Sequence, residues 1–401
     1  MITAFDDYLI HQTPLALAHV GTTDSNAYDR YFLEGYIADG SLIFGGAFGL
    51  YPNRDVMDAA FSVSFEGTQY SLFTSGRAPV ERGDSSVGPV KVEILQPMRS
   101  LRLLVNDRER GFIAELTFNA ITGAIDEGRQ TMTDGPRTSV DLTRYSQLGR
   151  WSGYIEVKGR RIELDGKQVL GVRDHSWGVR PLGGGGSTRW APQIHWYWGP
   201  IFFADECMHW HLNDNPEGEI QDRFLALVPR VENAGAGPLY MRDTGGEYLI
   251  PTAFTPRYRS GTRRLEHLFV QLSDKRGPRM TLEFIPNPSV LFSLMGLGYT
   301  NKAWEHGVWR GESMVDENAW PGHEQSPLFV RNSHMHHICK VVRDDGMEGT
   351  AILEQCLFGP HKPSTSPRAT SRSTACSTRC APKRTSRPRT AMTNGKPNFP
   401  R

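Results

Sequence analysis

The chain has 401 residues, of which 38% are hydrophobic and 22% charged, and it is long enough for two domains with separate cores. Residues 360–401 hold ten Lys or Arg and no Asp or Glu, so the overall charge of +1 conceals a body with a net charge of −9. An acidic body argues against nucleic-acid binding. No apolar run approaches about 18 residues, which excludes a transmembrane helix.

The N-terminus predicts no secretory signal, because Met1-Ile-Thr-Ala-Phe-Asp-Asp lacks a basic region followed by an apolar one. The five cysteines are an odd number, and their spacing matches no disulfide framework. We therefore expect a cytoplasmic protein in a reducing compartment.

Strand patterns dominate the first half of the chain after a lead-in over residues 1–29. A hairpin is predicted at Ala38-Asp39-Gly40, since Asp-Gly between apolar runs is a strong turn signal. A meander follows, then a polar stretch over residues 121–150 and a second hairpin across Lys158-Gly159. The predicted strands cover residues 31–36, 41–48, 61–65, 69–74, 90–95, 100–105, 112–118, 151–157 and 161–164.

The pattern then restarts, because residues 201–210 echo residues 35–44 and place Ala204-Asp205 on Ala38-Asp39. Such an echo is expected at the first hairpin of each copy of a duplicated barrel. Clear amphipathic helices are scarce. We predict an all-β fold of two similar antiparallel barrel-like domains, residues 1–186 and 187–362, with later strands over residues 224–228, 265–272, 280–285, 337–342 and 349–358.

Residues 363–401 are rich in Ser, Thr, Pro, Arg and Lys and contain almost no apolar residues, so they cannot build a core. We predict a disordered basic tail. A biological tail is one interpretation; we favour a frameshifted gene end, and so do not interpret Cys376 and Cys380 as metal ligands.

Residues 171–181 place an acid, an imidazole, an indole and guanidinium groups close together, ahead of the flexible run Gly183–Gly186. In an extended strand, Asp174 and Ser176 face one way, while Arg173, His175 and Trp177 face the other. The segment is either a functional site or a structural cluster that secures a strand end.

Five of the nine Trp lie between residues 175 and 211, at positions 177, 190, 196, 198 and 210. Together with Phe203 they suit either an apolar ligand or a well-packed core. His209 and His211 share a strand face, but no Cys or carboxylate pattern accompanies them, and we predict no metal site. Asp205 is either a buried acid or, as its echo Asp39 suggests, a turn residue.

A second polar and aromatic cluster, with Trp304 and His306, could face residues 171–181 across a domain interface. The sequence contains no nucleophile elbow, P-loop or Rossmann fingerprint. We therefore expect no cofactor.

The motif Asp174-His-Ser-Trp-Gly-x-Arg180 resembles the lipocalin-like superfamily of carotenoid 1,2-hydratases and AttH-type proteins. A bacterial branch of it carries stretches similar to Asp29-Arg-Tyr-Phe32, Tyr51-Pro-Asn-Arg54 and Gly296-Leu-Gly-Tyr299. The resemblance spans about residues 5–360 and implies two lipocalin-like β-barrels. In the hydratases a His-x-Trp pair and a later Tyr-x-Asp are implicated; His175 and Trp177 match the pair, whereas Phe203 stands in place of the Tyr before Asp205.

The resemblance implies a cofactor-independent hydratase, or a related lyase or isomerase, acting on a terpenoid or other apolar lipid. Protonation of an alkene needs a buried carboxylic acid, and the cation that forms needs aromatic faces. The alternative is a non-catalytic lipocalin-like protein that binds an apolar ligand. The expected catalytic residues are Asp174, His175, Trp177 and Asp205, and the expected ligand-binding residues are Arg180, Trp196, Trp198, Phe203, His209, Trp304 and His306.

Overall fold

The computed structural model describes residues 1–183, 193–231, 237–322 and 330–365. Strands make up most of this part of the chain, and none of its helices exceeds four residues. The all-β prediction is therefore confirmed. The short helices are η1 (Ala4–Asp7), η2 (Pro52–Arg54), α1 (Met241–Thr244), η3 (Leu294–Leu297), η4 (Val330–Ser333) and α2 (Lys362–Thr365).

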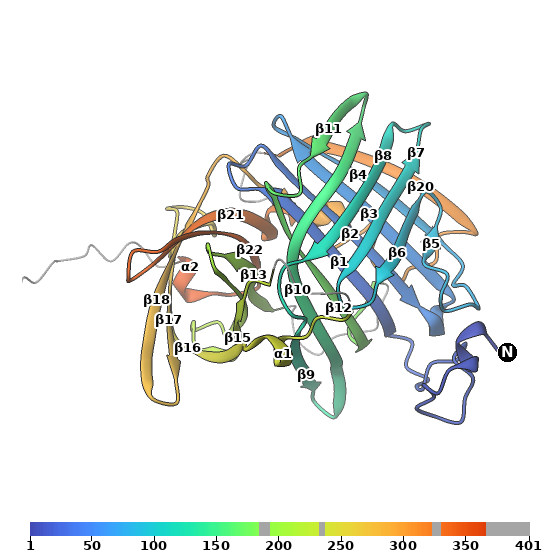
Figure 1. The fold of residues 1–401 in the computed structure, drawn as a ribbon, viewed down its shortest axis with the longest axis horizontal. Coiled ribbons are helices and arrows are strands. Elements are labelled where there is room, and N and C mark those ends of the chain that lie inside the picture. The colour runs from blue at the N-terminus through green and yellow to red at the C-terminus, as the bar shows by residue number, and fades with distance from the viewer. Residues whose placement is uncertain (184–192, 232–236, 323–329, 366–401) are drawn as a thin grey trace, which may run out of the picture. The chain divides into compact units, whose positions relative to one another are not determined.

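The first sheet is antiparallel and curled, and its strands lie side by side in the order β20-β4-β3-β2-β1-β12-β10-β8-β7-β6-β5, with β9 and β11 also paired to β10 (Figure 1). Strands β5 and β6 at one end contact β3 near the other end, which makes the sheet a half-barrel. Its strands are β1 (Ala27–Ile37), β2 (Leu42–Tyr51), β3 (Val56–Phe65), β4 (Thr68–Gly76), β5 (Ser86–Val87), β6 (Val90–Gln96), β7 (Ser100–Asp107), β8 (Phe112–Ala120), β9 (Ile125–Asp134), β10 (Arg137–Val157), β11 (Arg160–Leu164), β12 (Val169–Val179) and β20 (Ser313–Pro321).

The second sheet closes on itself. Its strand order is β18-β17-β16-β15-β14-β13-β22-β21-β19, and an additional pairing of β18 with β21 completes a barrel of eight strands. Its strands are β13 (Ile194–Phe202), β14 (Glu206–Asp214), β15 (Ile220–Pro229), β16 (Glu247–Tyr258), β17 (Leu265–Asp274), β18 (Gly277–Pro286), β19 (Phe292–Ser293), β21 (His334–Arg343) and β22 (Glu348–Phe358).

The two sheets do not divide the chain at one point, because β20 comes from the second half and pairs with β4 over Ser313–Pro321. The predicted boundary after residue 186 lies outside the described residues. Of the predicted disordered tail over residues 363–401, residues 363–365 instead belong to α2, and the rest lies outside the described residues. The division into two domains thus stays a prediction. Of the helices in the described part of the chain, none has the length and apolar character needed to cross a membrane.

Turn chemistry explains the first hairpin of each sheet. Gly40 has a φ of 87°, a left-handed conformation that costs glycine little, and Asp39 Oδ1 accepts a hydrogen bond of 2.8 Å from the backbone of Ser41. Asp205 lies in the exposed turn between β13 and β14. The two aspartates that the echo aligns thus each lie in a hairpin turn, while the duplication of a barrel stays a prediction.

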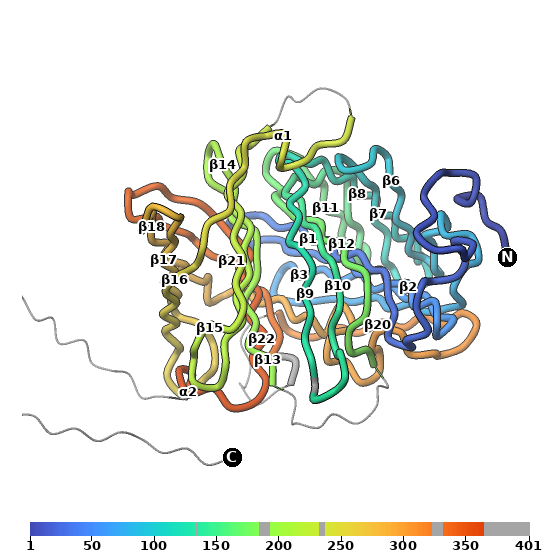
Figure 2. The backbone as a smooth tube through the Cα atoms, turned by 90° about the horizontal axis from the view of Figure 1, so that it is seen from below, coloured from blue at the N-terminus to red at the C-terminus, as the bar shows by residue number. Residues whose placement is uncertain are grey.

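The polar stretch over residues 121–150, to which the sequence analysis assigned no strand, contains β9 and the first half of β10. In Figure 2 these two strands run alongside each other. The long strand β10 pairs with β12 over residues 141–150 and with β8 over residues 149–157, so it joins two regions of the first sheet. The polar composition arises because much of β9 and of the first part of β10 is exposed to solvent.

Three apolar layers result from the alternation of side chains along the strands. One lies inside the curled sheet and includes Leu33 and Trp151, and another lies inside the second barrel and includes Trp210. The middle layer joins the sheets: the Phe32 ring meets Trp198 edge-on, with ring centroids 5.8 Å apart. The candidate site is built at the polar margin of this middle layer.

Candidate active site between the two sheets

Strand β12 sends its side chains to two different sides of the first sheet, as its alternating sequence predicts. Asp174 lies opposite Phe32 of β1 and Ser146 of β10, so all three point toward the second sheet. His175 points the other way, with its ring centroid 5.3 Å from that of Trp177. Asp174 and His175 are neighbours in sequence but belong to different clusters.

The first cluster contains two buried carboxylates that share one guanidinium group. Arg144 of β10 places Nε 3.1 Å from Asp174 Oδ2 and Nη1 3.3 Å from Glu127 Oε2. Glu127 comes from β9, which brings its carboxylate across β10 toward Asp174. Paired carboxylates around a fixed cation can differ in protonation state, and this is the first requirement of acid–base chemistry.

Two histidines of the second sheet complete the cluster. His209 Nε2 lies 2.9 Å from Glu127 Oε1, and His211 Nδ1 lies 3.2 Å from Glu127 Oε2. Both come from the outward face of β14, whose alternation places Trp210 inside the barrel instead. Ser146 Oγ donates a further hydrogen bond of 2.5 Å to Glu127. Glu127 is thus the centre of the cluster, and it joins the two sheets.

The two carboxyl groups have opposite pKa shifts. Burial raises the pKa of Asp174 to about 7, with the negative charge of Glu127 acting in the same direction and Arg144 opposing it. Burial also acts to raise the pKa of Glu127, but His209 and Arg144 outweigh it and hold this pKa well below its usual range. At neutral pH Glu127 is therefore an anion, whereas the Asp174 carboxyl group is protonated in part of the molecules.

Indole rings line the cluster on the side of the second sheet. Trp196 stacks on His211 with centroids 4.8 Å apart and an interplanar angle of 24°, and Trp198 meets His209 edge-on at 4.9 Å. The Arg144 guanidinium lies 5.5 Å from the centroid of Trp196. The structure therefore brings together four predicted site residues: Asp174, Trp196, Trp198 and His209.

The second cluster lies on the opposite face of β12. His175 Nε2 is 2.6 Å from Asp29 Oδ1, and the rings of Tyr31 and Tyr145 lie 4.4 and 5.4 Å from the imidazole, centroid to centroid. Trp177 is 40% exposed. The carboxylate orients the imidazole beside an accessible aromatic surface, which suits binding of a ring or an apolar chain with a polar end.

Trp304 and His306 form a third cluster. It also contains Arg30, Tyr51 and Tyr299, which lie in the three stretches that resemble the bacterial branch. His306 Nε2 lies 2.9 Å from Arg30 Nη2, and burial together with Arg30 holds the pKa of His306 well below its usual range. Trp304 stacks on Phe73 at 5.4 Å. Both line a cavity of about 10 Å³, which holds no more than a water molecule, so packing explains this cluster.

Arg30 is the centre of this third cluster. It donates a hydrogen bond of 2.6 Å to Tyr51 Oη and lies 5.3 Å from the ring centroid of Tyr299. Arg180 lies 4.7 Å from the ring centroid of Tyr28 and close enough to Asp174 to lower its pKa. Arg180 therefore lies between the first and third clusters.

Two predicted residues lie away from all three clusters. Asp205 is exposed in its hairpin turn, so the alternative of a buried acid is not what the structure shows: solvent surrounds the carboxyl group. Phe203 is buried in the core of the second barrel, where its side chain fills space. Trp190 lies outside the described residues.

Sequence reasoning missed Glu127 and Arg144. The available signal was the alternation of Arg144, Ser146 and Leu148 with Tyr145 and Gln147, a strand pattern inside a polar stretch to which no strand was assigned. Glu127 carries no such signal by itself. Its partners are on β14, 82 and 84 positions later.

Residues 2–366 match a protein family described as "Family of unknown function (DUF8625)". The chain belongs to this family. No match was found among curated proteins. The match to DUF8625 covers both sheets and all three clusters, whereas the bacterial branch and its His-x-Trp-Gly motif, inferred from resemblance, stay predictions.

Solved structures similar to this DUF8625 member include a putative AttH from Nitrosomonas europaea, with a TM-score of 0.49 and 14% identity over 82% of this chain and 92% of that one. Kievitone hydratase from Nectria haematococca has a TM-score of 0.49 and 13% identity over 84% and 93% of the two chains. CghA with Sch210972 has a TM-score of 0.47 and 10% identity over 84% and 90%.

Proposed function

We propose that this protein is a cofactor-independent acid–base enzyme, of the hydratase or related lyase class, that acts on an apolar lipid-like substrate such as a terpenoid. One observation carries the proposal: Asp174 and Glu127 flank one guanidinium group at 3.1 and 3.3 Å and have opposite pKa shifts. Two carboxyl groups whose pKa values are separated by their surroundings are typical of an acid and its partner base.

In the proposed reaction the Asp174 carboxyl group protonates one carbon of an alkene, and Arg144 stabilises the carboxylate that remains. The positive charge on the other carbon is met by the faces of Trp196 and Trp198. A water molecule adds to that carbon and passes its proton to the Glu127–His209 pair. Return of this proton to Asp174 restores the resting enzyme, so no redox cofactor enters the balance.

His175, expected to be catalytic, does not take part in this reaction. The backbone of β12 separates its ring from the Asp174 carboxyl group, so we assign the positioning of water to His209, which lies 2.9 Å from Glu127. His175 and Trp177 then hold a distal part of the ligand or support the strand end. Substrate reaches Asp174 at the margin of the sheets, where the side chains of Arg144 and Asp174 retain 15% and 11% exposure.

A second candidate function is non-catalytic binding of an apolar ligand on the other face of β12. It is supported by the 40% exposure of Trp177 beside His175, Tyr31 and Tyr145. The ion pair of Asp174 with Arg144 also fits this candidate, because it opposes the protonation of Asp174 that burial favours.

The test begins with purification of the full chain and identification of co-purifying lipids by mass spectrometry. Incubation of these lipids in heavy-oxygen water then distinguishes the candidates: the wild-type protein should give a product that contains one added oxygen from water. Asp174→Asn should slow product formation by about 100-fold or more, the usual loss when a general acid is removed. Asp205→Asn, in the exposed turn, is the matched control and should leave the rate unchanged.

The two candidates predict different results for His175→Ala. If the protein is a hydratase with its acid at Asp174, this variant binds ligand less well but still forms product. If wild-type protein and Asp174→Asn both return the lipid unchanged, and only His175→Ala loses the lipid, the hydratase proposal fails and the binding protein remains.

A further inference from the structure

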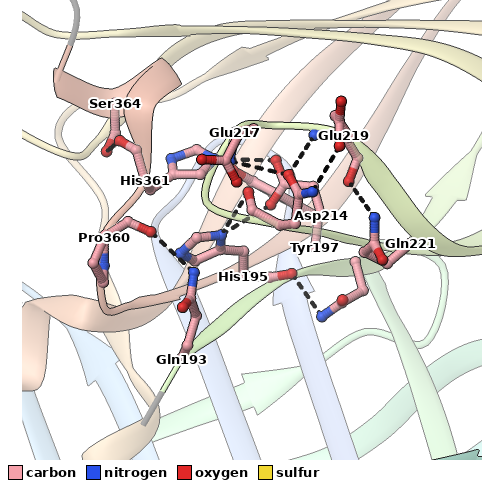
Figure 3. A network of polar contacts seen from close by, with 12 residues as sticks. Gln193, His195, Tyr197, Asp214, Glu217, Glu219, Gln221, Pro360, His361 and Ser364 are labelled. Atoms are coloured by element: carbon pink, nitrogen blue, oxygen red, sulfur yellow. Dashed lines mark hydrogen bonds and ion pairs between the residues drawn. The ribbon is translucent and has the colours of Figure 1, made fainter. Parts of the chain in front are cut away.

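Three ligand-type side chains that belong to none of the three clusters above meet at one end of the second barrel (Figure 3). His195 Nδ1 lies 3.2 Å from Asp214 Oδ1, and His361 Nε2 lies 3.0 Å from Asp214 Oδ2. All three side chains are fully buried. The ring centroids of the two histidines are 4.3 Å apart, so both imidazoles lie close to one carboxylate.

The barrel topology brings these residues together from distant parts of the sequence. His195 is the second residue of β13 and Asp214 is the last residue of β14, and these two strands are paired. His361 follows the end of β22, which pairs with the other side of β13. Two neighbouring strands and the segment that follows a third therefore supply one residue each at the same barrel end.

The loop that follows Asp214 is held in place before any ligand arrives. Asn215 Oδ1 accepts hydrogen bonds of 3.0 and 2.9 Å from the backbones of Glu217 and Glu219. The backbone of Lys362 donates to Pro216 at 2.8 Å, which fixes the chain beside His361. A site on such a framework binds a ligand with little loss of conformational entropy.

One imidazole nitrogen is shared between two oxygens of this cluster. The buried oxygen Asp214 Oδ1 faces His195 Nδ1 at 3.2 Å, and the same nitrogen lies 3.3 Å from the carbonyl oxygen of Asn215. One N–H cannot satisfy both oxygens fully, so a bound ion would satisfy the buried carboxylate better.

The donor set and its spacing suit a transition-metal ion. The candidate ligand atoms all lie within 4.8 Å of one another. Tetrahedral Zn²⁺ with bonds of about 2.0–2.2 Å places its ligand atoms about 3.3 Å apart, close to the two spacings seen here. Two imidazoles with one carboxylate form a donor set that first-row divalent ions bind well, whereas Ca²⁺ and Mg²⁺ prefer oxygen ligands.

We propose that His195, Asp214 and His361 bind a divalent transition-metal ion, with Zn²⁺ the best fit, through one atom each. The ion would fasten the chain at residues 361–365 to the ends of β13 and β14. Three protein ligands leave a fourth position for water. The site shares no residue with the Asp174 cluster, and the proposal does not depend on the proposed function.

Titration of the metal-free full chain with Zn²⁺, followed by calorimetry and by metal analysis after gel filtration, tests the site. Wild type should bind one equivalent with a submicromolar dissociation constant and should melt at a higher temperature with Zn²⁺ than with a chelator. His361→Ala and Asp214→Asn should each weaken binding more than about 100-fold, because loss of a direct ligand exceeds the 10–100-fold loss typical of an outer-shell partner.

The matched control is His267→Ala. His267 Nδ1 lies 2.9 Å from Glu283 on the same barrel, a half-buried histidine–carboxylate pair that belongs to no group of three metal-ligand residues within the described residues. This variant should bind Zn²⁺ like wild type. If a variant fails to fold, Co²⁺ spectra of His361→Gln and His195→Gln replace it, and both should lose the visible bands of an ordered low-coordinate site. No Zn²⁺ bound by wild type, or unchanged binding in both ligand variants, overturns the proposal.

Discussion

Glu34 of the first sheet and His336 of the second form a fully buried ion pair, with Oε1 2.6 Å from Nδ1, although 302 positions separate them in the sequence. The same imidazole lies 3.6 Å from Glu354, which also contacts His334 at 2.5 Å. A second charged network therefore crosses the junction between the sheets, apart from the one centred on Glu127.

Removal of one member of this pair should be strongly destabilising. Glu34→Ala leaves the buried His336 without its partner at 2.6 Å and with the more distant Glu354 at 3.6 Å, so the free energy of unfolding should fall by about 3 kcal/mol. Urea denaturation at neutral pH measures the loss. Glu115→Ala, at a half-exposed position of β8, is the control and should change stability by less than about 0.5 kcal/mol. A loss for Glu34→Ala as small as that of the control would show that the pair does not join the sheets.

Alkaline pH should weaken the same network. Burial favours neutral His336, but Glu34 and Glu354 outweigh it and raise the pKa to about 9 from its ordinary 6.5. Because the folded protein holds the His336 proton more tightly than the unfolded chain does, protonated His336 stabilises the fold. This stabilisation is complete below about pH 6.5 and is lost as the pH rises through 9. The loss is about 3 kcal/mol, since one pKa unit corresponds to about 1.4 kcal/mol.

Chemical denaturation of wild type and His336→Gln at pH 6.5 and 9.5 measures this dependence. Wild type should lose stability between the two values, and the variant should lose less. Equal losses would mean that other groups cause the alkaline effect.

Asp174 should titrate near neutral pH in the folded protein. The infrared band of a protonated carboxyl group should disappear with a midpoint near 7 in wild type and should be missing from Asp174→Asn. The charge of Glu127 contributes to the raised pKa, so Glu127→Gln should move the midpoint to lower pH. A wild-type midpoint near 4 would remove the basis for Asp174 as the acid.

Gly171 should not tolerate even one added methyl group. A Cβ there would lie 2.2 Å from the Glu34 carbonyl oxygen and 2.4 Å from the Trp151 ring, whose Nε1 donates to that same carbonyl at 2.7 Å. Gly171→Ala should therefore lower the free energy of unfolding by about 3 kcal/mol or more. Gly166→Ala, whose Cβ would lie 3.3 Å from the Ser152 side chain, is a milder control for thermal denaturation.

Local sequence patterns predicted the features that depend on adjacent residues alone, namely strand faces and hairpin turns. The period of two along residues 173–177 placed Asp174 and His175 on opposite faces, and Asp-Gly chemistry located the hairpin at Asp39. The echo between Asp39 and Asp205 located the turn between β13 and β14 in the second sheet. Each of these inferences needed only a few adjacent positions.

The candidate site depended on pairings that no local pattern contains. Asp174 meets Arg144 because β12 lies between β1 and β10, and Glu127 meets His209 only through the packing of one sheet on the other. The proposed metal site has the same origin. In the sequence, most strands of the second barrel lie between His195 and His361, and only the barrel topology brings the two rings together. Residue types were visible in the sequence, but the contacts that give them chemical roles were not.

The pairing of β20 with β4 has a consequence for the time course of synthesis. Until residues 313–321 leave the ribosome, β4 is an open edge of the first sheet, with unpaired backbone groups next to an apolar core. At about 5–20 residues per second this interval lasts tens of seconds. Nascent chains of this protein are thus exposed to edge-to-edge association during most of translation, and a chaperone that covers strand edges would be needed most before β20 arrives.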